Sequence, residues 1–174
     1  MDAKKILKSF AIKAIITFIS WMILYYGFIL PDGKINDVLT ASVLDSSVMV
    51  LKWIGYNAHS ADYIIYVDGQ ESVLVADACN GFELLALYIG FFLCFPGPIR
   101  FKIIFIPIGS LVIFSINIIR EVSLVLNYNY FQQSFDFNHK YTYAFFVYTA
   151  VFLIWRFWLN NYSFIGKRIE QQAR

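Results

Sequence analysis

Three polar side chains that could act together in a reaction lie at the boundaries of long apolar segments of this chain. Cys79 stands at the start of one apolar segment, Arg120 at the end of the next and His139 at the beginning of the last. If these segments cross a membrane in alternating directions, all three residues return to the same membrane face. A thiol, a guanidinium and an imidazole together can perform nucleophilic catalysis, in which a thiolate attacks and an imidazole transfers the proton.

The cysteine occupies a place that favours its reactive form. Cys79 opens a predicted helix between Asp77 and Gly81, where free backbone N–H groups and the helix dipole stabilise a thiolate. Such stabilisation matters because an ordinary thiol in water is only a few per cent ionised at about pH 7. The alternative is that Cys79 is a small apolar residue in a buried helix.

Arg120 and His139 each have a chemical role and a plainer alternative. Arg120 would hold the developing oxyanion or the thiolate by charge-assisted hydrogen bonds; alternatively, it extends to lipid head groups or pairs with Glu121. His139 would act as general base toward Cys79 and then as general acid toward the leaving amine. A single histidine at a membrane interface is, however, often only a polar boundary residue. We interpret His59, the other histidine, as structural.

Four further residues are candidates for supporting the reaction. Asn117 lies three residues before the arginine and therefore on the same helical face. Glu83, one helical turn after the cysteine, would orient the arginine or a polar group of a substrate, or else cap the start of the helix. Asn80 and Gly81 complete the motif that begins with the cysteine.

The composition identifies an integral membrane protein. Hydrophobic residues make up 59% of the chain and the mean hydropathy is +0.61, whereas soluble domains contain about 45–50% apolar residues. A length of 174 residues accommodates one bundle of a few spanning helices, so we expect a single membrane-embedded domain over residues 1–174. The net charge of +2 and the dispersed basic residues argue against a nucleic-acid partner.

The chain has two cysteines, Cys79 and Cys94, which are too few for a disulfide framework. On one helix their spacing of 15 residues would separate them by about 22 Å, far beyond the roughly 7 Å that a disulfide allows. We therefore expect two free thiols, with Cys94 in the core. The scattered histidines and cysteines lack the paired spacing of a zinc site, and no glycine-rich phosphate loop is present, so we expect neither a metal nor a cofactor.

Four apolar segments predict an all-α integral membrane fold. We expect about four transmembrane helices, at about residues 10–30, 81–95, 101–119 and 141–159. The segment at about residues 31–77 contains seven of the twelve acidic residues and should lie in the extracytoplasmic aqueous phase. Residues 127–139 should form a polar and aromatic loop before the last helix.

An amphipathic helix and a small β-hairpin are predicted within the extracytoplasmic segment. Spacings near 3.6 favour a helix that lies along the membrane surface and presents Val38, Leu39, Val43, Leu44, Val48, Leu51 and Ile54 on one face. Runs of β-branched and aromatic residues at 63–67 and 72–75 flank the turn pair Asp68-Gly69. The hairpin should lead directly to Cys79.

The basic residues indicate the orientation of the chain in the cytoplasmic (inner) membrane. Four crossings place both termini on one side, and the positive-inside rule assigns the more basic side to the cytoplasm. Eight basic residues then lie inside, namely Lys4, Lys5, Lys8, Arg100, Lys102, Lys167, Arg168 and Arg174. Four lie outside or at the outer boundary, namely Lys34, Lys52, Arg120 and Lys140. We expect cytoplasmic termini and an extracytoplasmic active site.

In the motifs that contain Cys79, Arg120 and His139, the chain resembles the exosortase and archaeosortase transpeptidases. The resemblance rests on Ala78-Cys79-Asn80-Gly81 after a short hairpin, on Asn117-x-x-Arg120 and on His139 at the start of the last helix. It covers about residues 73–158, and the small size and four-segment layout resemble the short exosortase F type. Many relatives have serine or threonine where this chain has Asn80.

The resemblance implies that Cys79 is the nucleophile, Arg120 the stabiliser of the transition state and His139 the acid-base residue. It implies a cysteine peptidase or transpeptidase that cuts a C-terminal sorting tail from exported proteins and passes the new carboxyl end to an envelope acceptor. The expected partners are exported proteins with a C-terminal sorting helix, membrane lipids and a small membrane partner protein. A non-enzymatic membrane assembly or interaction subunit, with polar residues that stabilise helix contacts, is the main alternative. The absence of a Cys-x-x-Cys pair disfavours a thiol redox protein.

Overall fold

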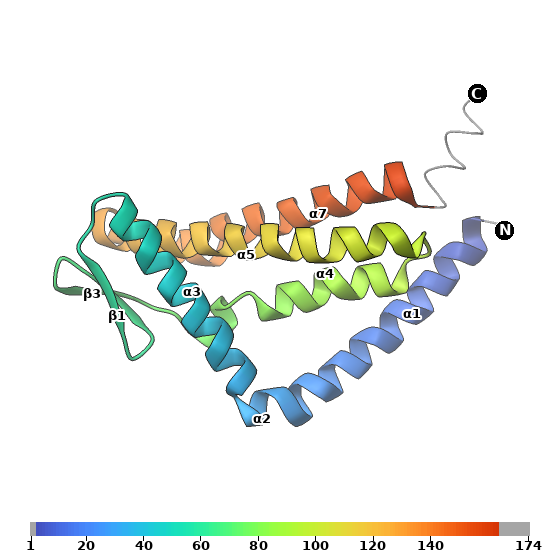
Figure 1. Ribbon diagram of the computed structural model, residues 1–174, viewed down its shortest axis with the longest axis horizontal. Coiled ribbons are helices and arrows are strands. Elements are labelled where there is room, and N and C mark those ends of the chain that lie inside the picture. The colour runs from blue at the N-terminus through green and yellow to red at the C-terminus, as the bar shows by residue number, and fades with distance from the viewer. Residues whose placement is uncertain (1–2, 164–174) are drawn as a thin grey trace. The chain divides into compact units, whose positions relative to one another are not determined.

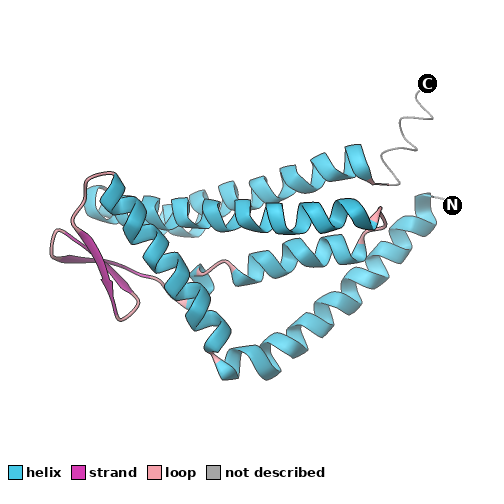
Figure 2. Cartoon of the chain, in the orientation of Figure 1, coloured by secondary structure: helices cyan, strands magenta, loops and turns pink. Residues whose placement is uncertain are grey.

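The described part of the chain, residues 3–163, is mostly helical and contains one small sheet, as the computed structural model in Figures 1 and 2 shows. It divides into two compact units. The first comprises residues 1–31, 83–112 and 149–174, and the second comprises residues 32–82 and 113–148. Of the candidate site residues, Glu83 belongs to the first unit and the others belong to the second.

Three helical stretches within residues 3–163 are long and apolar enough to cross a membrane, namely Lys8–Asp32, Ile99–Tyr130 and Gln132–Tyr162. The apolar helix α4 (Phe82–Cys94) has 13 residues, fewer than the roughly 20 that a crossing requires. The prediction of helices in the four apolar segments is confirmed. The number of four crossings stays a prediction.

The first unit buries aromatic rings between apolar helices. It contains α1 (Ala3–Leu24), its continuation through a π-helical turn (Tyr25–Ile29) toward α2 (Leu30–Asp32), α4, and parts of α5 (Ile99–Tyr130) and α7 (Tyr143–Tyr162). Phe91 stacks on Trp155 with 4.5 Å between ring centroids, and Trp158 is completely buried. Cys94 is buried as predicted, and its thiol donates to Thr17 Oγ1 at 3.1 Å. Both cysteines are free.

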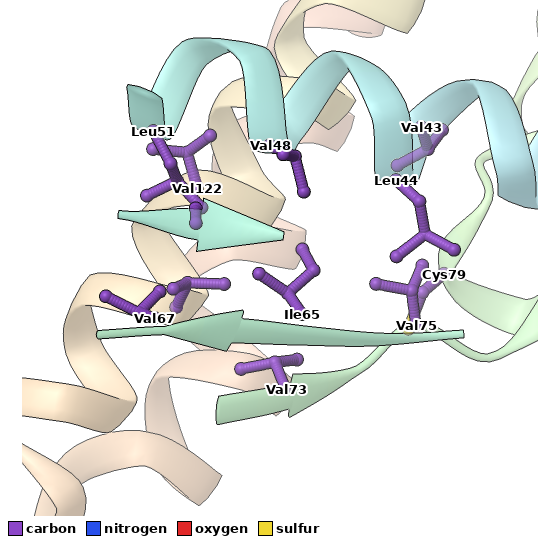
Figure 3. Packing of buried hydrophobic residues seen from close by; sticks show 12 residues of the cluster. Val43, Leu44, Val48, Leu51, Ile65, Val67, Val73, Val75, Cys79 and Val122 are labelled. Carbon is purple, nitrogen blue, oxygen red and sulfur yellow. The ribbon is translucent and has the colours of Figure 1, made fainter. Parts of the chain in front are cut away.

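The second unit packs a helix against a sheet. It contains α3 (Lys34–Trp53), the antiparallel strands β1 (Ala58–Ala61), β2 (Ile64–Val67) and β3 (Gln70–Leu74), and a 3₁₀ turn, η2 (Asp77–Cys79). The rest of α5 follows, with η3 (Gln132–Ser134), α6 (Phe135–Phe137) and the π-helical turn η4 (Asn138–Thr142). In Figure 3 the apolar side chains of α3 point toward those of the strands. Cys79 is a member of this core cluster.

The predicted hairpin is present, and a third strand extends it. Val67 pairs with Gln70 across Asp68-Gly69, and both turn residues have positive φ, at 53° and 80°. These angles are those of a type I′ turn, which suits the twist of paired strands. The third strand, β1, was not predicted: Ala61 pairs with Ile64 across Asp62-Tyr63, whose φ angles are 49° and 64°. Neither of those turn residues is glycine, so the sequence contains little signal for β1.

The buried face of α3 differs from the predicted apolar face. Val43, Leu44, Val48 and Leu51 are buried as expected, but Val38 is 66% exposed and Ile54, just beyond the helix, is 52% exposed. Instead, the helix buries a row of polar residues, Asn36, Thr40 and Ser47. The spacing of this polar row matches the helical repeat, so these side chains share the inward face.

Helix α5 is longer than predicted. The apolar run predicts a helix that ends at about residue 119 and a loop over residues 127–139, whereas the helix continues to Tyr130. Val122, Leu124 and Val125 are buried along this extension. Arg120 and Glu121 interrupt the apolar run, but their side chains turn inward, so the helix does not end at this charged pair. Arg120 therefore lies within a helix and not at its end.

Candidate active site

Cys79 lies in a tight turn that leads from the sheet toward α4. Its backbone N–H donates to Ala76 O at 2.8 Å, and the N–H of Asn80 donates to Asp77 O at 3.2 Å. The sequence predicts that Cys79 opens a helix, where backbone N–H groups are free. That detail was wrong, because α4 begins only at Phe82 and the N–H of Cys79 is used inside η2. The residue is 9% exposed.

Asn80 ties this turn to α3 and to the start of α4. Its Oδ1 accepts a hydrogen bond from the N–H of Phe82 at 2.8 Å, which satisfies one of the donors that every helix start leaves open. Its Nδ2 donates to Asn36 Oδ1 at 3.2 Å and to Thr40 Oγ1 at 3.3 Å. The Thr40 hydroxyl in turn donates to Asp77 Oδ1 at 3.3 Å. The polar row of α3 therefore forms hydrogen bonds with residues before and after Cys79, namely Asp77 and Asn80.

Gly81 permits the close approach of α5. Its φ of +80° is a conformation that residues with a Cβ rarely adopt. A Cβ added here would lie 3.3 Å from Cγ and 3.4 Å from Nδ2 of Asn117. Both the backbone conformation and the neighbouring side chain therefore favour glycine.

Asn117 and Arg120 reach Cys79 from one face of α5. Asn117 Nδ2 donates to Cys79 O at 2.9 Å, and its Oδ1 accepts from Arg120 Nη1 at 3.2 Å. Arg120 Nη1 also donates to Cys79 O at 3.5 Å. The second nitrogen of the fork, Nη2, donates to Cys79 Sγ at 3.6 Å. Arg120 therefore contacts the thiol as the sequence analysis expected, although it lies inside the helix.

His139 approaches the same sulfur atom from the turn that precedes α7. Its Nε2 lies 3.8 Å from Cys79 Sγ. The ring stacks on Phe135 at an interplanar angle of 19° and a centroid distance of 5.8 Å. Phe135 in turn packs against the core cluster, so the imidazole stacks on a side chain that contacts the core. The structure thus brings together the three residues that the sequence analysis selected.

An acidic partner of Arg120 within the second unit is Glu121. Glu121 Oε1 lies 3.2 Å from Arg120 Nη1, and the Glu121 side chain is completely buried. The contact has the distance of an ion pair but not the angles of a hydrogen bond, and neither carboxylate oxygen has a hydrogen-bond partner among the described residues. Glu83 is exposed, and its predicted role toward Arg120 stays a prediction. A pair with Glu121 is the plainer alternative that the sequence offers for Arg120, and the structure contains this pair together with the contact to the thiol.

Asn36 and Thr40 are site residues that the sequence analysis missed. The available signal was their spacing, since polar side chains at positions 36, 40 and 47 follow one face of an otherwise apolar helical pattern. His59 stacks on Tyr66, its partner across β1 and β2, with 5.0 Å between centroids. Within residues 3–163, no group of three His, Cys, Asp or Glu side chains could hold a metal ion.

Comparison with known families assigns the chain. The model of the transmembrane exosortase (EpsH) family matches residues 6–156. The chain belongs to the transmembrane exosortase family. The matched range contains Cys79, Arg120 and His139. Three helices of spanning length make this exosortase a multi-pass membrane protein. Neither the curated proteins nor the solved structures contain a match to it.

Proposed function

We propose that this exosortase is a membrane cysteine transpeptidase or protease of the short exosortase F type. It would cleave C-terminal sorting signals of exported proteins and transfer the new carboxyl end to an envelope acceptor. The observation that supports this function is the pair of contacts at one sulfur atom, 3.6 Å to the Arg120 guanidinium and 3.8 Å to the His139 imidazole. Nucleophile, base and stabilising charge are the parts that acyl transfer needs.

In the first half of the reaction, Cys79 Sγ gives its proton to His139 Nε2, with the histidine in the tautomer that carries its own proton on Nδ1. The thiolate, facing Arg120 Nη2, attacks the carbonyl carbon of the scissile peptide bond. Arg120 stabilises the oxyanion of the tetrahedral intermediate. When the C–N bond breaks, His139 gives its proton to the leaving amine, and a thioester on Cys79 remains. These contacts are longer than those of a reacting complex and would shorten when substrate binds.

In the second half, an acceptor amine attacks the thioester carbonyl. His139 Nε2 takes the proton that the amine loses, and the departing Cys79 thiolate recovers that proton from the imidazole. Water in place of the amine would give hydrolysis by the same steps. The side chains that hold the turn, Asn117 and Asn80, keep the sulfur in reach of both partners throughout.

The site would lie at the outer face of the cytoplasmic membrane, with four crossings and cytoplasmic termini. The eight-to-four distribution of basic residues supports this orientation. Helix α5 has 32 residues and is therefore about 48 Å long, whereas the hydrocarbon core is about 30 Å thick. If the excess length lies at the outer end, Arg120 comes to the membrane boundary, where a cation is tolerated. Of the basic residues counted on the inner side, Lys167, Arg168 and Arg174 lie outside the described residues.

The function is tested by replacing each cysteine in turn. Cys79→Ala should abolish processing of a substrate whose mass is followed, while Cys94→Ala, which removes a buried thiol bonded to Thr17, should leave it largely intact. The substrate would be an exported protein of the same genome that ends in a short motif, one apolar helix and basic residues. Equal processing by Cys79→Ala and the parent would reject cysteine catalysis and favour the assembly-subunit alternative.

A further inference from the structure

Glu121 is a buried carboxylate that the proposed reaction does not use. Its side chain is completely buried, and it lies in the second unit beside the residue that contacts the thiol. An ionised carboxylate in such a place is costly unless an opposite charge lies close to it. The nearby opposite charge is the Arg120 guanidinium, 3.2 Å from Glu121 Oε1.

The hydrogen bonds of Arg120 show what kind of interaction this is. Nη1 carries two hydrogens, and it donates to two oxygens, Asn117 Oδ1 at 3.2 Å and Cys79 O at 3.5 Å. The contact with Glu121 lacks hydrogen-bond geometry. The position of the guanidinium is therefore held by Asn117 and the Cys79 backbone, while Glu121 acts on it through charge alone.

One guanidinium thus faces two acidic groups, the Glu121 carboxylate at Nη1 and the Cys79 thiol at Nη2. A carboxylate that already neutralises the guanidinium opposes a second negative charge on the sulfur. If the charge of Glu121 is removed and the guanidinium keeps its position, a thiolate at Cys79 should therefore be stabilised more strongly by Arg120.

We propose that Glu121 is a positioning residue that acts through its charge. As the counter-charge of Arg120, it lowers the reactivity of the Cys79 thiol before substrate binds. Glu121 has this role only within the proposed thiol mechanism, on which it rests. The reactivity of the thiol can nevertheless be measured without any substrate, so the two proposals can fail separately.

The test is the rate at which iodoacetamide alkylates Cys79 at pH 7. The full chain carries Cys94→Ala, so that Cys79 is the one thiol whose alkylation is measured. Glu121→Gln keeps the volume of the side chain and removes its charge, and it should raise the alkylation rate about 3- to 10-fold, because the ordinary thiol is mostly protonated at this pH. Glu121→Asp retains the charge and should stay near the parent rate. Glu71→Gln, the same change at an exposed residue of β3, is the matched control and should have no effect.

A purely structural role for Glu121 gives a different pattern among the variants. Loosening the site would expose the thiol, which is 9% exposed, and would raise the alkylation rate in Glu121→Asp as much as in Glu121→Gln. That pattern, or an alkylation rate of Glu121→Gln that is unchanged or lower, would overturn the proposal. If Glu121→Gln does not accumulate, Glu121→Met removes the charge without burying an amide and should also react faster than the parent. An unchanged alkylation rate together with loss of processing in Cys79→Ala would reject the role of Glu121 and leave the proposed function standing.

Discussion

The substitution Gly81→Ala should separate the cost of backbone strain from the cost of disturbing the site. Gly81 and Gly69 both have a φ of +80°, but they differ in their surroundings. A Cβ at Gly69 would meet nothing within 4 Å, whereas a Cβ at Gly81 would lie 3.3 Å from Asn117 Cγ. Gly69→Ala is therefore a control with the same strain and no clash.

The magnitudes follow from these contacts. Placing alanine at positive φ costs roughly 1–2 kcal/mol at either position. At Gly81, Asn117 must also move by a few tenths of an ångström, which weakens its bond to Cys79 O and its contact with Arg120. A neutral hydrogen bond contributes about 1 kcal/mol and one to a charged group about 1.5–3 kcal/mol. A loss of about 1.4 kcal/mol from the transition state lowers the rate about tenfold.

We therefore expect Gly81→Ala to slow substrate processing at least about tenfold, and Gly69→Ala to leave it near the parent rate although both lower the melting temperature in detergent. The assay is the rate of substrate cleavage, followed by mass, at matched protein levels. Adding Asn117→Ala should shrink the difference between the two glycine variants, because the side chain that the new Cβ meets is gone. Equal processing rates for Gly81→Ala and Gly69→Ala would refute the reasoning that Gly81 makes room for Asn117.

Two other measurements address the guanidinium and the orientation. Arg120→Lys should lower turnover by about 100-fold at normal protein level, because an ammonium cannot contact the sulfur and Asn117 with two separate nitrogens. Full cleavage by this variant would mean that Arg120 only contacts lipid head groups. Single cysteines introduced at the exposed positions Lys34 and Gln133, in a chain with both natural cysteines replaced by alanine, should be labelled from the extracytoplasmic side by a membrane-impermeant maleimide. Labelling from the cytoplasm alone would contradict the proposed orientation.

The amino-acid sequence determined the local features of this protein. Apolar runs of helical length predicted the helices that carry the site, and the pair Asp68-Gly69 predicted a hairpin turn, because each depends on residues close together in the chain. The three chemically distinct side chains, Cys79, Arg120 and His139, were selected from their types and from alternation across a membrane. The structure then placed both partners within 4 Å of one sulfur atom.

Tertiary structure decided which neighbours hold those residues. Strand β1 forms by pairing with the edge of β2. Helix α5 continues past Arg120 because the following residues pack on the core cluster. In the same way, Thr40 of α3 bonds to Asn80 across 40 residues of sequence, and Arg120 of α5 contacts the Cys79 thiol across 41 residues. Side-chain partners over such distances depend on packing between elements, and local residue patterns contain little information about that packing.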